Sequence, residues 1–530
     1  MSSYKPDPNK NINLTVNGIP VTVSEGSRIL EAAKKAGVQI PTLCDHPDLC
    51  KRSLCRLCVV ECDGRGKLIA ACANDVYEGV KVVTNNLRIM TIRKTILELL
   101  LANHPQECLT CVKNKKCELQ KLAETFGIRE SPFRREALDN RPPKTESETL
   151  VRDMNKCIKC GRCVAVCQEI QTVRAINSSC RNTQYEICTP YGQSLSDSHC
   201  IFCGQCAAVC PVGAIFENDQ TGEVWSALES PGRHVVAEIS SSVAAGICGE
   251  LDLPPGSVTG RKMVTALKRM GFNKVFDAGV MVHETVREEI HELIERKNNH
   301  GKLPLVTSCS PAWINFVKEF YPDLSVHLPA AKDPIQNFGA LAKSWYEKES
   351  GTDKSKITSV SITPCIVKKF EARRMHTNGF RDVDVALTTQ EIARMIKLAG
   401  IDLCDLPETP FDTVKFDIVK SDVVKPDSKD KSQDGIMEAI LRTVYKDYTG
   451  ETPIVPEYND VQNRAWLREA ELDFQGSKVK VLIVNGFANA RIVMEAIRKG
   501  ECDAAFVEII SCPSGCATDI AYTINRAPNT

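Results

Sequence analysis

The sequence predicts a multidomain α+β protein, and three observations support this. First, the chain has 530 residues, which is enough for roughly three to four domains of ~150 residues each. Second, its apolar pattern changes from short alternating strands near the start to alternating strands and helices after about residue 230. Third, 26 residues are cysteine, and 19 of them lie at or before Cys210. We therefore expect small cysteine-rich domains followed by a larger α/β domain.

Charge and hydropathy exclude several functional classes. The chain has 67 Lys and Arg against 67 Asp and Glu, so net charge gives no reason to expect a nucleic-acid or anionic-membrane partner. Its start lacks the apolar segment of a signal peptide, and no run approaches the ~18 apolar residues of a membrane span. We expect a cytoplasmic protein, in which closely spaced cysteines are metal ligands rather than disulfides.

The first expected unit is a β-grasp domain over residues 1–90. Residues 13–23 alternate between polar and apolar and are split by the hairpin dipeptide Asn17-Gly18, which predicts two strands. Ser27 is expected to cap a helix that runs from Arg28 to about Lys35 and ends at Gly37.

Three further segments follow along the chain. A helix is predicted over Leu87–Ala102 and leads into a small domain at 91–130, and the polar, Pro-bearing residues 131–150 read as a linker. After a cysteine-rich domain at 151–225, an α/β domain is expected over 230–530. Its clearest strands are Leu303–Val306, Ile357–Ile362, Val479–Val484 and Ala504–Ile509. Three of these strands lead into Ser/Thr/Cys loops, and ligands in α/β folds bind at strand carboxyl ends.

The first group of candidate ligands lies on the loops after the β-grasp helix. It consists of Cys44, Cys55, Cys58 and Cys72, spaced C-x10-C-x2-C-x13-C. Two irons bridged by two sulfides need four thiolates, and the close Cys55/Cys58 pair can hold one iron. A zinc site is the alternative, because such pairs also bind zinc. The β-grasp context favours a plant-type [2Fe–2S] cluster.

The second group follows the Leu87–Ala102 helix. It consists of His104, Cys108, Cys111 and Cys117. Three thiolates and one imidazole can ligate a [4Fe–4S] cube, and replacing a thiolate by a neutral imidazole should raise its potential. The alternative is a structural histidine beside three cysteines.

The third group is a pair of ferredoxin-type runs, C-x2-C-x2-C-x3-C, in residues 151–225. In such runs the fourth cysteine ligates the other cluster. One [4Fe–4S] cube therefore takes Cys157, Cys160, Cys163 and Cys210, and the other takes Cys200, Cys203, Cys206 and Cys167. The front of the chain is thus expected to hold one [2Fe–2S] and three [4Fe–4S] clusters.

The last group is spread over three segments of the α/β domain. They are Thr307-Ser-Cys-Ser-Pro-Ala-Trp313, Thr363-Pro-Cys-Ile-Val-Lys-Lys-Phe-Glu371 and Phe506-Val-Glu-Ile-Ile-Ser-Cys-Pro-Ser-Gly-Cys516. These segments resemble the signature loops TSCCPxW, PCxxKKxE and ExMxCxGGCxxGG of [FeFe]-hydrogenases. The order of the upstream clusters is also similar, although residues 1–220 alone would equally resemble the large peripheral subunit of complex I or some formate dehydrogenases.

The resemblance implies roles for individual residues. In that family four cysteines hold a [4Fe–4S] cube, and one of them bridges to a diiron centre with CO and CN ligands. Cys365, Cys512 and Cys516 match three of these ligands, with Cys516 bridging, and Ser310 stands at the fourth position. Cys309 matches a proton-relaying cysteine and could instead ligate the cube. Lys368 matches the lysine that contacts a cyanide, and Glu288 lies where the proton path would run.

Four departures from the family pattern fall around this pocket. Ser310 supplies an alkoxide, which is a harder ligand than a thiolate. The charged run Lys425–Asp434 replaces a glycine-rich apolar loop before Gly435-Ile-Met-Glu-Ala, and apolar walls would keep such a site dry. Ala517-Thr-Asp-Ile replaces glycines after Cys516, and Ile239-Ser-Ser-Ser-Val243 stands where Ala-Pro-Ser/Ala-Val is usual. Together these changes indicate that the diiron centre is absent.

Three functions fit these sequence features. The favoured one is an electron-transfer subunit like that of electron-bifurcating, transhydrogenase-type complexes, relaying electrons between a flavin/NAD(P) partner and ferredoxin. The chain lacks G-x-G-x-x-G and P-loop motifs, so flavin and nucleotide would belong to partner subunits of a hetero-oligomer. The alternative is an active [FeFe]-hydrogenase with Cys309, Glu288 and Lys368 in its catalytic machinery. A role in cytosolic iron–sulfur assembly ranks third.

Overall fold

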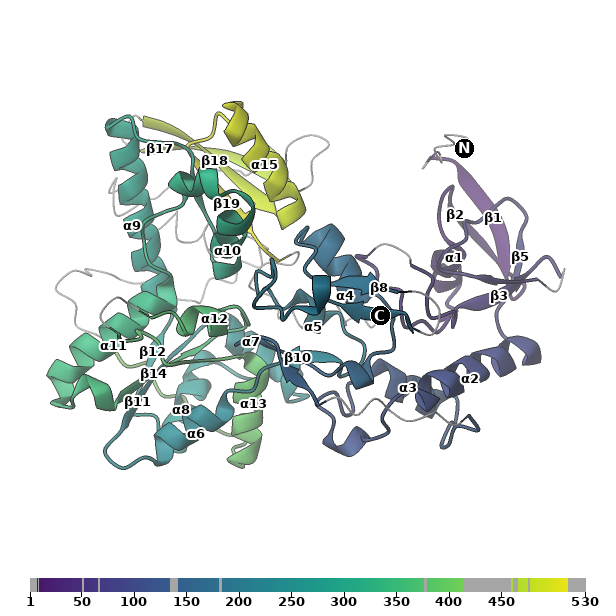
Figure 1. The fold of residues 1–530 in the computed structure, drawn as a ribbon, viewed down its shortest axis with the longest axis horizontal. Helices are drawn as coiled ribbons and strands as arrows, with labels where there is room; N and C mark the ends of the chain where they lie inside the picture. Colours follow the sequence, from purple (N-terminus) through teal and green to yellow (C-terminus); the bar gives the residue numbers. More distant parts are fainter. Residues whose placement is uncertain are drawn as a thin grey trace. The chain divides into compact units, whose positions relative to one another are not determined.

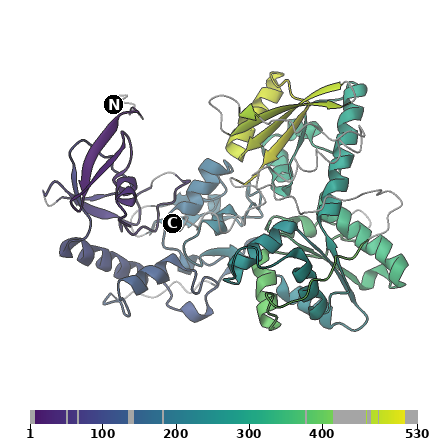
Figure 2. The same ribbon diagram turned by 180° about the vertical axis from the view of Figure 1, so that it is seen from behind.

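The protein divides into two compact units (Figures 1 and 2). The computed structural model describes residues 7, 9–49, 52–64, 67–133, 142–180, 184–375, 379–413, 459–460, 466–474 and 477–512. Unit 1 lies within residues 1–146, 150–198 and 205–216, and unit 2 lies within 147–149, 199–204 and 217–530. Among the described helices, none combines the length and apolar character that a membrane crossing requires.

Unit 1 begins with the predicted β-grasp. Its elements are β1 (Asn11–Val16), β2 (Ile19–Ser24), α1 (Ile29–Lys35), β3 (Val59–Cys62), β4 (Leu68–Ala70) and β5 (Lys81–Val83). The strand order β2-β1-β5-β3-β4 places the parallel β1–β5 pair at the centre of a mixed sheet. Asn17 and Gly18 have φ angles of 51° and 83°, as the predicted two-residue hairpin turn requires. Ile29, Ala32 and Ala33 of α1 are buried against the sheet.

The predicted helix cap at Ser27 is wrong by one residue. The N-cap is Arg28, which is still extended because it forms an isolated bridge with Asp75. Its backbone N–H donates to the Glu31 carboxylate at 2.9 Å, so an acidic side chain in the first turn satisfies the end of the helix. Gly37, at φ 74°, follows the helix end as predicted.

The rest of unit 1 consists of short elements around the cysteine runs. Helix α2 (Leu87–Ala102) has the predicted bounds, and Asn86 caps it by accepting from the Ile89 N–H at 2.9 Å. The other elements are α3 (Glu118–Thr125), β6 (Lys144–Thr145), β7 (Leu150–Arg152), α4 (Arg162–Ala165), a π-helical turn (Val166–Ile170), β8 (Asn177–Ser179), β9 (Glu186–Cys188), α5 (Gln205–Ala208) and β10 (Ile215–Glu217). Strands β10, β7 and β6 form one sheet, so the described end of the predicted 131–150 linker contributes a strand.

Unit 2 contains a four-stranded parallel sheet of order β12-β11-β14-β15. Its strands are β11 (His234–Ile239), β12 (Lys274–Asp277), β14 (Ile357–Ile362) and β15 (Val385–Leu387). Helices α6 (Thr221–Glu229), α7 (Ser241–Glu250), α8 (Gly260–Met270) and α13 (Thr389–Leu398) pack on one face. The other face meets α9 (Gly279–Asn298) and α11 (Pro334–Ser350). Both faces are covered, as apolar parallel strands require, and β14 has its predicted bounds.

A second sheet in unit 2 has the order β13-β19-β18-β17-β16. Its strands are β13 (Leu305–Thr307), β16 (Asn459–Asp460), β17 (Leu467–Phe474), β18 (Ser477–Asn485) and β19 (Phe506–Ile510), of which β13, β19 and β18 run parallel. Helices α10 (Pro311–Phe320) and α15 (Phe487–Lys499) share a stacked aromatic core of Trp313, Phe316 and Phe487. The short helix α12 (Lys368–Ala372) follows β14. The predicted strands in this sheet are confirmed to within two residues.

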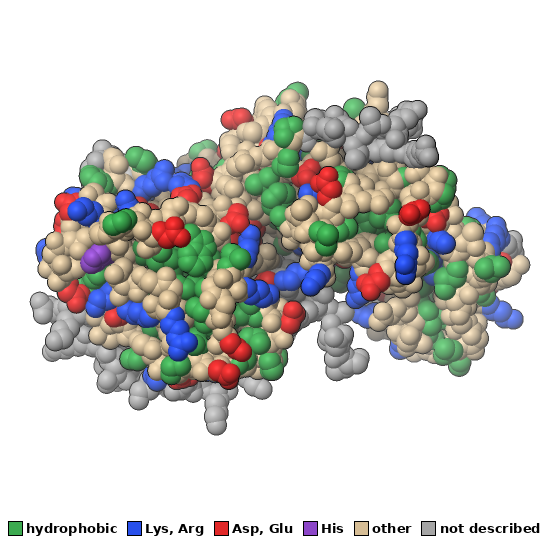
Figure 3. Space-filling model, turned by 90° about the horizontal axis from the view of Figure 1, so that it is seen from below, with side chains coloured by type: hydrophobic (Ala, Val, Ile, Leu, Met, Phe, Trp, Pro, Cys, Tyr) green, Lys and Arg blue, Asp and Glu red, His purple; other side chains and the backbone are tan. Residues whose placement is uncertain are grey.

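The surface agrees with the neutral overall charge. On the face drawn in Figure 3, acidic and basic side chains are interspersed. Ion pairs of this kind recur along the chain, for example between Arg498 and Asp323 at 2.8 Å. Such exposed pairs contribute little stability, so the cores described above carry the fold.

One carboxyl group is buried inside the parallel sheet. Glu238 on β11 is 1% exposed and accepts a hydrogen bond from Ser361 on β14 at 2.8 Å. Its second oxygen has no hydrogen-bond partner among the described residues. Burial raises the pKa of Glu238 to about 8, so the folded protein holds this group as a neutral acid near pH 7.

This burial predicts a pH-dependent cost in stability. Below the ordinary pKa of a carboxyl group, the protonated Glu238 makes its full contribution to the stability of the folded state. This contribution is lost as the pH rises from about 5 through 8, because the unfolded chain ionises first. In urea unfolding, we expect the wild type to lose about 2–3 kcal/mol more unfolding free energy between pH 6 and pH 9 than Glu238→Gln does. Glu229→Gln, at an exposed position on α6, is the matched control and should show no such difference. Parallel pH profiles for wild type and Glu238→Gln would contradict the assignment.

Candidate functional site

The four predicted [2Fe–2S] ligands come together in unit 1. The Sγ atoms of Cys58 and Cys72 lie 3.3 Å apart, at the ends of the loops that flank β3 and β4. Hydrogen bonding with Cys55 and Cys72 lowers the pKa of the Cys44 thiol, so contacts between neighbouring thiols link all four cysteines. By contrast, burial raises the pKa of Cys62 to about 11, and that thiol faces the β-grasp core. Four converging thiols fit a cluster that needs four thiolates.

The two ring nitrogens of His104, in the second group, have different surroundings. His104 Nδ1 lies 2.7 Å from the Pro105 carbonyl oxygen, which fixes Nδ1 as the donor and leaves the lone pair on Nε2. Nε2 is buried and has no hydrogen-bond partner among the described residues. Burial lowers the pKa of His104, so the imidazole is neutral, as ligation requires. Cys108 and Cys111 lie close enough to Cys117 to help raise the pKa of its thiol, whose main cause is burial.

The first ferredoxin-type set is also assembled within unit 1. Burial raises the pKa of Cys157 to about 11 and that of Cys160 to about 12, and in both cases the nearby Cys210 adds to the increase. The pKa of the fully buried Cys163 is raised mainly by burial, and the nearby Cys160, Cys157 and Cys210 raise it further. Cys210 of the second run therefore lies near Cys157, Cys160 and Cys163, as the predicted exchange of the fourth cysteines requires.

The second run starts with the same loop conformation as the first. The Phe202 N–H donates to Cys200 Sγ at 3.4 Å, and the Lys159 N–H donates to Cys157 Sγ at the same distance. Cys200 and Cys203 belong to unit 2, whereas Cys206 and Cys167 belong to unit 1. Burial raises the pKa of Cys167.

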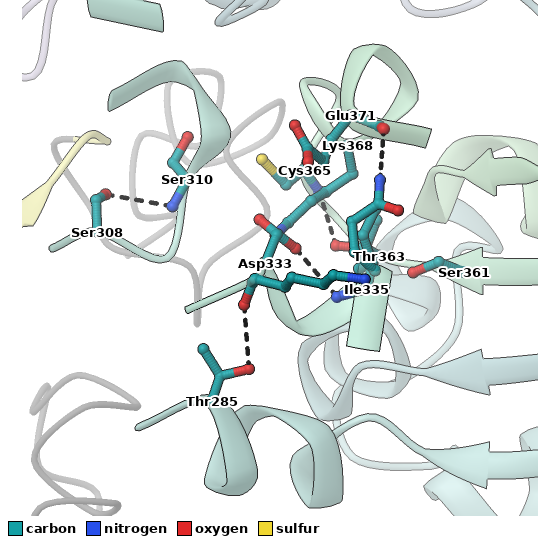
Figure 4. A network of polar contacts seen from close by, with 12 residues as sticks. Thr285, Ser308, Ser310, Asp333, Ile335, Ser361, Thr363, Cys365, Lys368 and Glu371 are labelled. Atoms are coloured by element: carbon teal, nitrogen blue, oxygen red, sulfur yellow. Dashed lines mark hydrogen bonds and ion pairs between the residues drawn. The ribbon is translucent and has the colours of Figure 1, made fainter. Parts of the chain in front are cut away.

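The loops of the α/β domain meet at the carboxyl ends of parallel strands. Cys309 follows β13, Cys365 follows β14 and Cys512 follows β19. Ser308 and Ser511 join two of these loops through their hydroxyl groups, which lie 3.3 Å apart. Burial raises the pKa of Cys365 to about 11, and Cys309 is near enough to oppose its ionisation further. Figure 4 shows Cys365 facing the loop that carries Ser308 and Ser310.

Ser310 stands at the start of α10. It is 5% exposed, and its backbone N–H donates to the Ser308 hydroxyl at 3.2 Å. Cys309 is half-buried beside it. Cys516 and the charged run Lys425–Asp434 lie outside the described residues, so the described part of this ligand set is Cys309 or Ser310, Cys365 and Cys512.

The lysine of this site is engaged by a carboxylate that the sequence did not single out. Lys368 Nζ lies 2.7 and 2.6 Å from the two carboxylate oxygens of Asp333, and both side chains are almost fully buried (Figure 4). Asp333 is the N-cap of α11 and also accepts from the Ile335 N–H at 3.0 Å. This contact raises the pKa of Lys368 despite its burial. The lysine is therefore charged and already neutralised by a fixed anion.

Glu288, which was predicted to lie on a proton path, differs in burial from its neighbour Glu289. Glu288 is exposed on α9, whereas Glu289 is buried and accepts a hydrogen bond from Thr307 at 2.7 Å, two residues before Cys309. Burial raises the pKa of Glu289 to about 8. The helical spacing of buried Val286, Ile290 and Leu293 could have identified this face, because Glu289 lies on it and Glu288 does not.

The described thiols approach one another from several loops. Across the part of the chain that the structure describes, no three His, Cys, Asp or Glu side chains surround one point that would hold a single metal ion. The protein ligands of a [4Fe–4S] cube lie farther apart than those of a single metal ion, because each of the four irons takes one protein ligand.

Family models match almost the whole chain. Residues 233–518 match "Iron only hydrogenase large subunit, C-terminal domain". In the front part, residues 9–87 match a 2Fe-2S iron-sulfur cluster binding domain and residues 93–132 match the NADH-ubiquinone oxidoreductase-G iron-sulfur binding region. Residues 147–216 match the ferredoxin-like domain of NADH-quinone oxidoreductase subunit 3.

Individual relatives agree with these matches. The NADP-reducing hydrogenase subunit HndD of Solidesulfovibrio fructosivorans is 38% identical over 95% of this chain and 87% of its own length. Iron hydrogenase 1 of Clostridium pasteurianum is 34% identical over the same shares, 95% and 87%. A solved apo [FeFe]-hydrogenase HydA1 variant from Chlamydomonas reinhardtii aligns with a TM-score of 0.50 at 27% identity, covering 57% of this chain and 83% of that one. The chain is therefore a hydrogenase-like iron–sulfur protein and belongs to the [FeFe]-hydrogenase large-subunit family.

Proposed function

We propose that this chain is an electron-transfer subunit whose hydrogenase-like domain holds a [4Fe–4S] cube but no diiron centre. The observation that carries this proposal is the buried ion pair between Lys368 and Asp333. In the family that the sequence resembles, the matching lysine contacts a cyanide ligand. Here the same cation is bound by both oxygens of a carboxylate, so its charge is already satisfied within the protein.

The electrostatics of the pair argue against an anionic diiron unit at this place. A cyanide would have to displace Asp333 from Lys368, and removing one partner of a buried pair typically costs about 3–5 kcal/mol. If Asp333 stayed, its negative charge would lie against the negative ligands of the diiron unit. Ser310 adds to this difficulty, because a hydroxyl is a poorer ligand for a cube than a thiolate.

The proposed clusters use the candidate ligands that the sequence predicts, of which Cys516 lies outside the described residues. We assign the [2Fe–2S] cluster to Cys44, Cys55, Cys58 and Cys72, and one cube to His104, Cys108, Cys111 and Cys117. The ferredoxin-type runs supply two more cubes, and Cys309, Cys365, Cys512 and Cys516 supply the last. The neighbouring thiols support these assignments, and so does His104 Nε2, which has no hydrogen-bond partner within the described part of the chain.

The partners are inferred from chemistry that this chain lacks. A relay of clusters needs an electron source and an acceptor, and the sequence has no flavin or nucleotide motif of its own. We propose flavin/NAD(P)-binding iron–sulfur subunits and ferredoxin as partners in a cytoplasmic, bifurcating, transhydrogenase-type complex. The similarity to HndD, which is named as a subunit of an NADP-reducing hydrogenase, supports a hetero-oligomer.

A second candidate is an active [FeFe]-hydrogenase. The observation that favours it is the buried Glu289, hydrogen-bonded to Thr307 close to Cys309, since a neutral buried acid can pass protons toward that thiol. The same carboxyl group is also explained as a structural bond between α9 and β13.

Infrared spectroscopy separates the two candidates. We expect protein matured with hydrogenase assembly factors to show no CO or CN stretching bands, and to contain about 18 irons, from one [2Fe–2S] and four [4Fe–4S] clusters. CO and CN bands in the wild type would establish the diiron centre and overturn the electron-transfer proposal in favour of the hydrogenase.

The Lys368–Asp333 pair has its own test. Asp333→Asn leaves a buried lysine without its counterion, so we expect a loss of roughly 3 kcal/mol in the free energy of unfolding. The pair Lys480–Asp503 is more exposed, and Asp503→Asn is the matched control, with an expected loss of less than about 1 kcal/mol. Equal effects of the two substitutions would show that Asp333 is not the counterion of Lys368.

His104 can be tested through the reduction potential of its cube. His104→Cys replaces a neutral imidazole by a thiolate, and the added negative charge should lower the potential in EPR-monitored titration. His104→Ala should remove up to about four irons. His291→Ala, at an exposed site on α9, is the control and should change neither quantity. An unchanged potential and iron content in both His104 variants would exclude ligation.

A further inference from the structure

The two ferredoxin-type loops share a backbone but differ in one side chain. In the second loop Phe202 has φ 60° and Gly204 has φ 73°, and in the first loop Lys159 has φ 57° and Gly161 has φ 75°. Lys159 is exposed, whereas Phe202 is only 8% exposed. The cluster-binding conformation therefore does not explain why position 202 is buried, and a contact outside the loop does.

That contact is an aromatic stack within unit 2. The rings of Phe202 and Phe370 have centroids 4.4 Å apart and planes inclined by 17°. Phe202 lies between Cys200 and Cys203, and Phe370 lies on α12, five residues after Cys365. The stack thus joins the loop of one predicted cluster to the loop of another.

A glycine makes the approach of the two loops closer still. A Cβ atom at Gly204 would lie 2.2 Å from Ile366 Cγ2, which is far inside van der Waals contact. Gly204 directly follows Cys203, and Ile366 directly follows Cys365. Any side chain at 204 would therefore push Ile366, and the Cys365 loop with it, away from the ferredoxin loop.

The first loop also has a glycine in close contact with another cysteine loop. A Cβ atom at Gly161 would lie 3.0 Å from Leu54 Cδ1, and Leu54 directly precedes Cys55 of the proposed [2Fe–2S] site. In both loops, the glycine after the second cysteine meets a residue adjacent to a cysteine of another proposed cluster.

We propose that Gly204, Ile366 and the Phe202–Phe370 stack form the electron junction between the cube of Cys200 and Cys203 and the cube of Cys365. These are positioning residues, which hold the two cysteine loops in contact. Such close packing matters because electron tunnelling slows steeply with distance and with gaps in packing. With both cubes bound, one electron would leave the ferredoxin-type cube and enter the second cube, with no bond made or broken. The inference rests on the proposed function, since it requires a cube in the hydrogenase-like domain.

The test measures electron transfer inside the full-length, cluster-loaded protein. Photoreduced deazaflavin supplies the electrons, and freeze-quench EPR follows reduction of the cube that is lost in Cys365→Ser. We expect Gly204→Ala to keep its iron and sulfide content but to reduce this cube at least several-fold more slowly than the wild type. Ile366→Ala, which opens a gap from the other side, should also slow reduction. Combining the two should recover part of the rate, because the new methyl group fills the space left by Ile366.

Controls separate the contact from backbone strain and from the proposed function. Gly400→Ala has the same sign of φ, 67°, but its Cβ would meet nothing within 4 Å, and it should reduce the cube at the wild-type rate. Wild-type rates in both Gly204→Ala and Ile366→Ala would overturn the junction while leaving the electron-transfer function intact. About 14 irons in the wild type, with no signal lost in Cys365→Ser, would overturn the proposed cube and the junction with it.

Discussion

The front half of the protein depends on keeping many sulfur atoms away from water. Burial raises the pKa of Cys157 and Cys160 to about 11 and 12, so without metal these groups are neutral thiols at physiological pH. The elements that carry them are too short to be stable alone, since α4 and α5 have four residues each. Metal binding would replace the thiol protons and tie these turns together, so folding and cluster assembly are coupled in such a domain.

The two consecutive lysines at the start of α12 have different roles. Lys368 pairs with Asp333, beside Cys365. Lys369 is fully buried, and its Nζ donates to Glu391 at 2.6 Å and to the Asn218 carbonyl at the same distance. Glu391 also accepts a hydrogen bond from the Gln220 N–H and belongs to the capping box of α13. Lys369 is therefore structural, and it holds the chain after β10 to the parallel sheet beneath the site.

How much the sequence predicted depended on how local each feature is. The ferredoxin-like domain, α2 and β14 were predicted correctly because spacing and periodicity within a few residues determine them. Asp333 was missed because its role arises only when α11 places it against a lysine 35 residues away. Glu288 was predicted rather than Glu289 because a resemblance by sequence position does not say which of the two lies on the buried face of α9. The zinc and iron–sulfur alternatives for Cys44, Cys55, Cys58 and Cys72 share the same spacing, so sequence alone left both open.

The duplicated ferredoxin loop has a consequence for how such proteins can change over time. The backbone of the loop, with its positive φ angles and its amide-to-sulfur hydrogen bond, is the same in both copies. This backbone conformation does not determine the side chain at the tip of the loop. That residue is the exposed Lys159 in one copy and the packed Phe202 in the other. A single substitution at the tip can thus give a loop a new neighbour without disturbing its metal chemistry. Modules of this kind can be recombined into new assemblies while each keeps its cofactor.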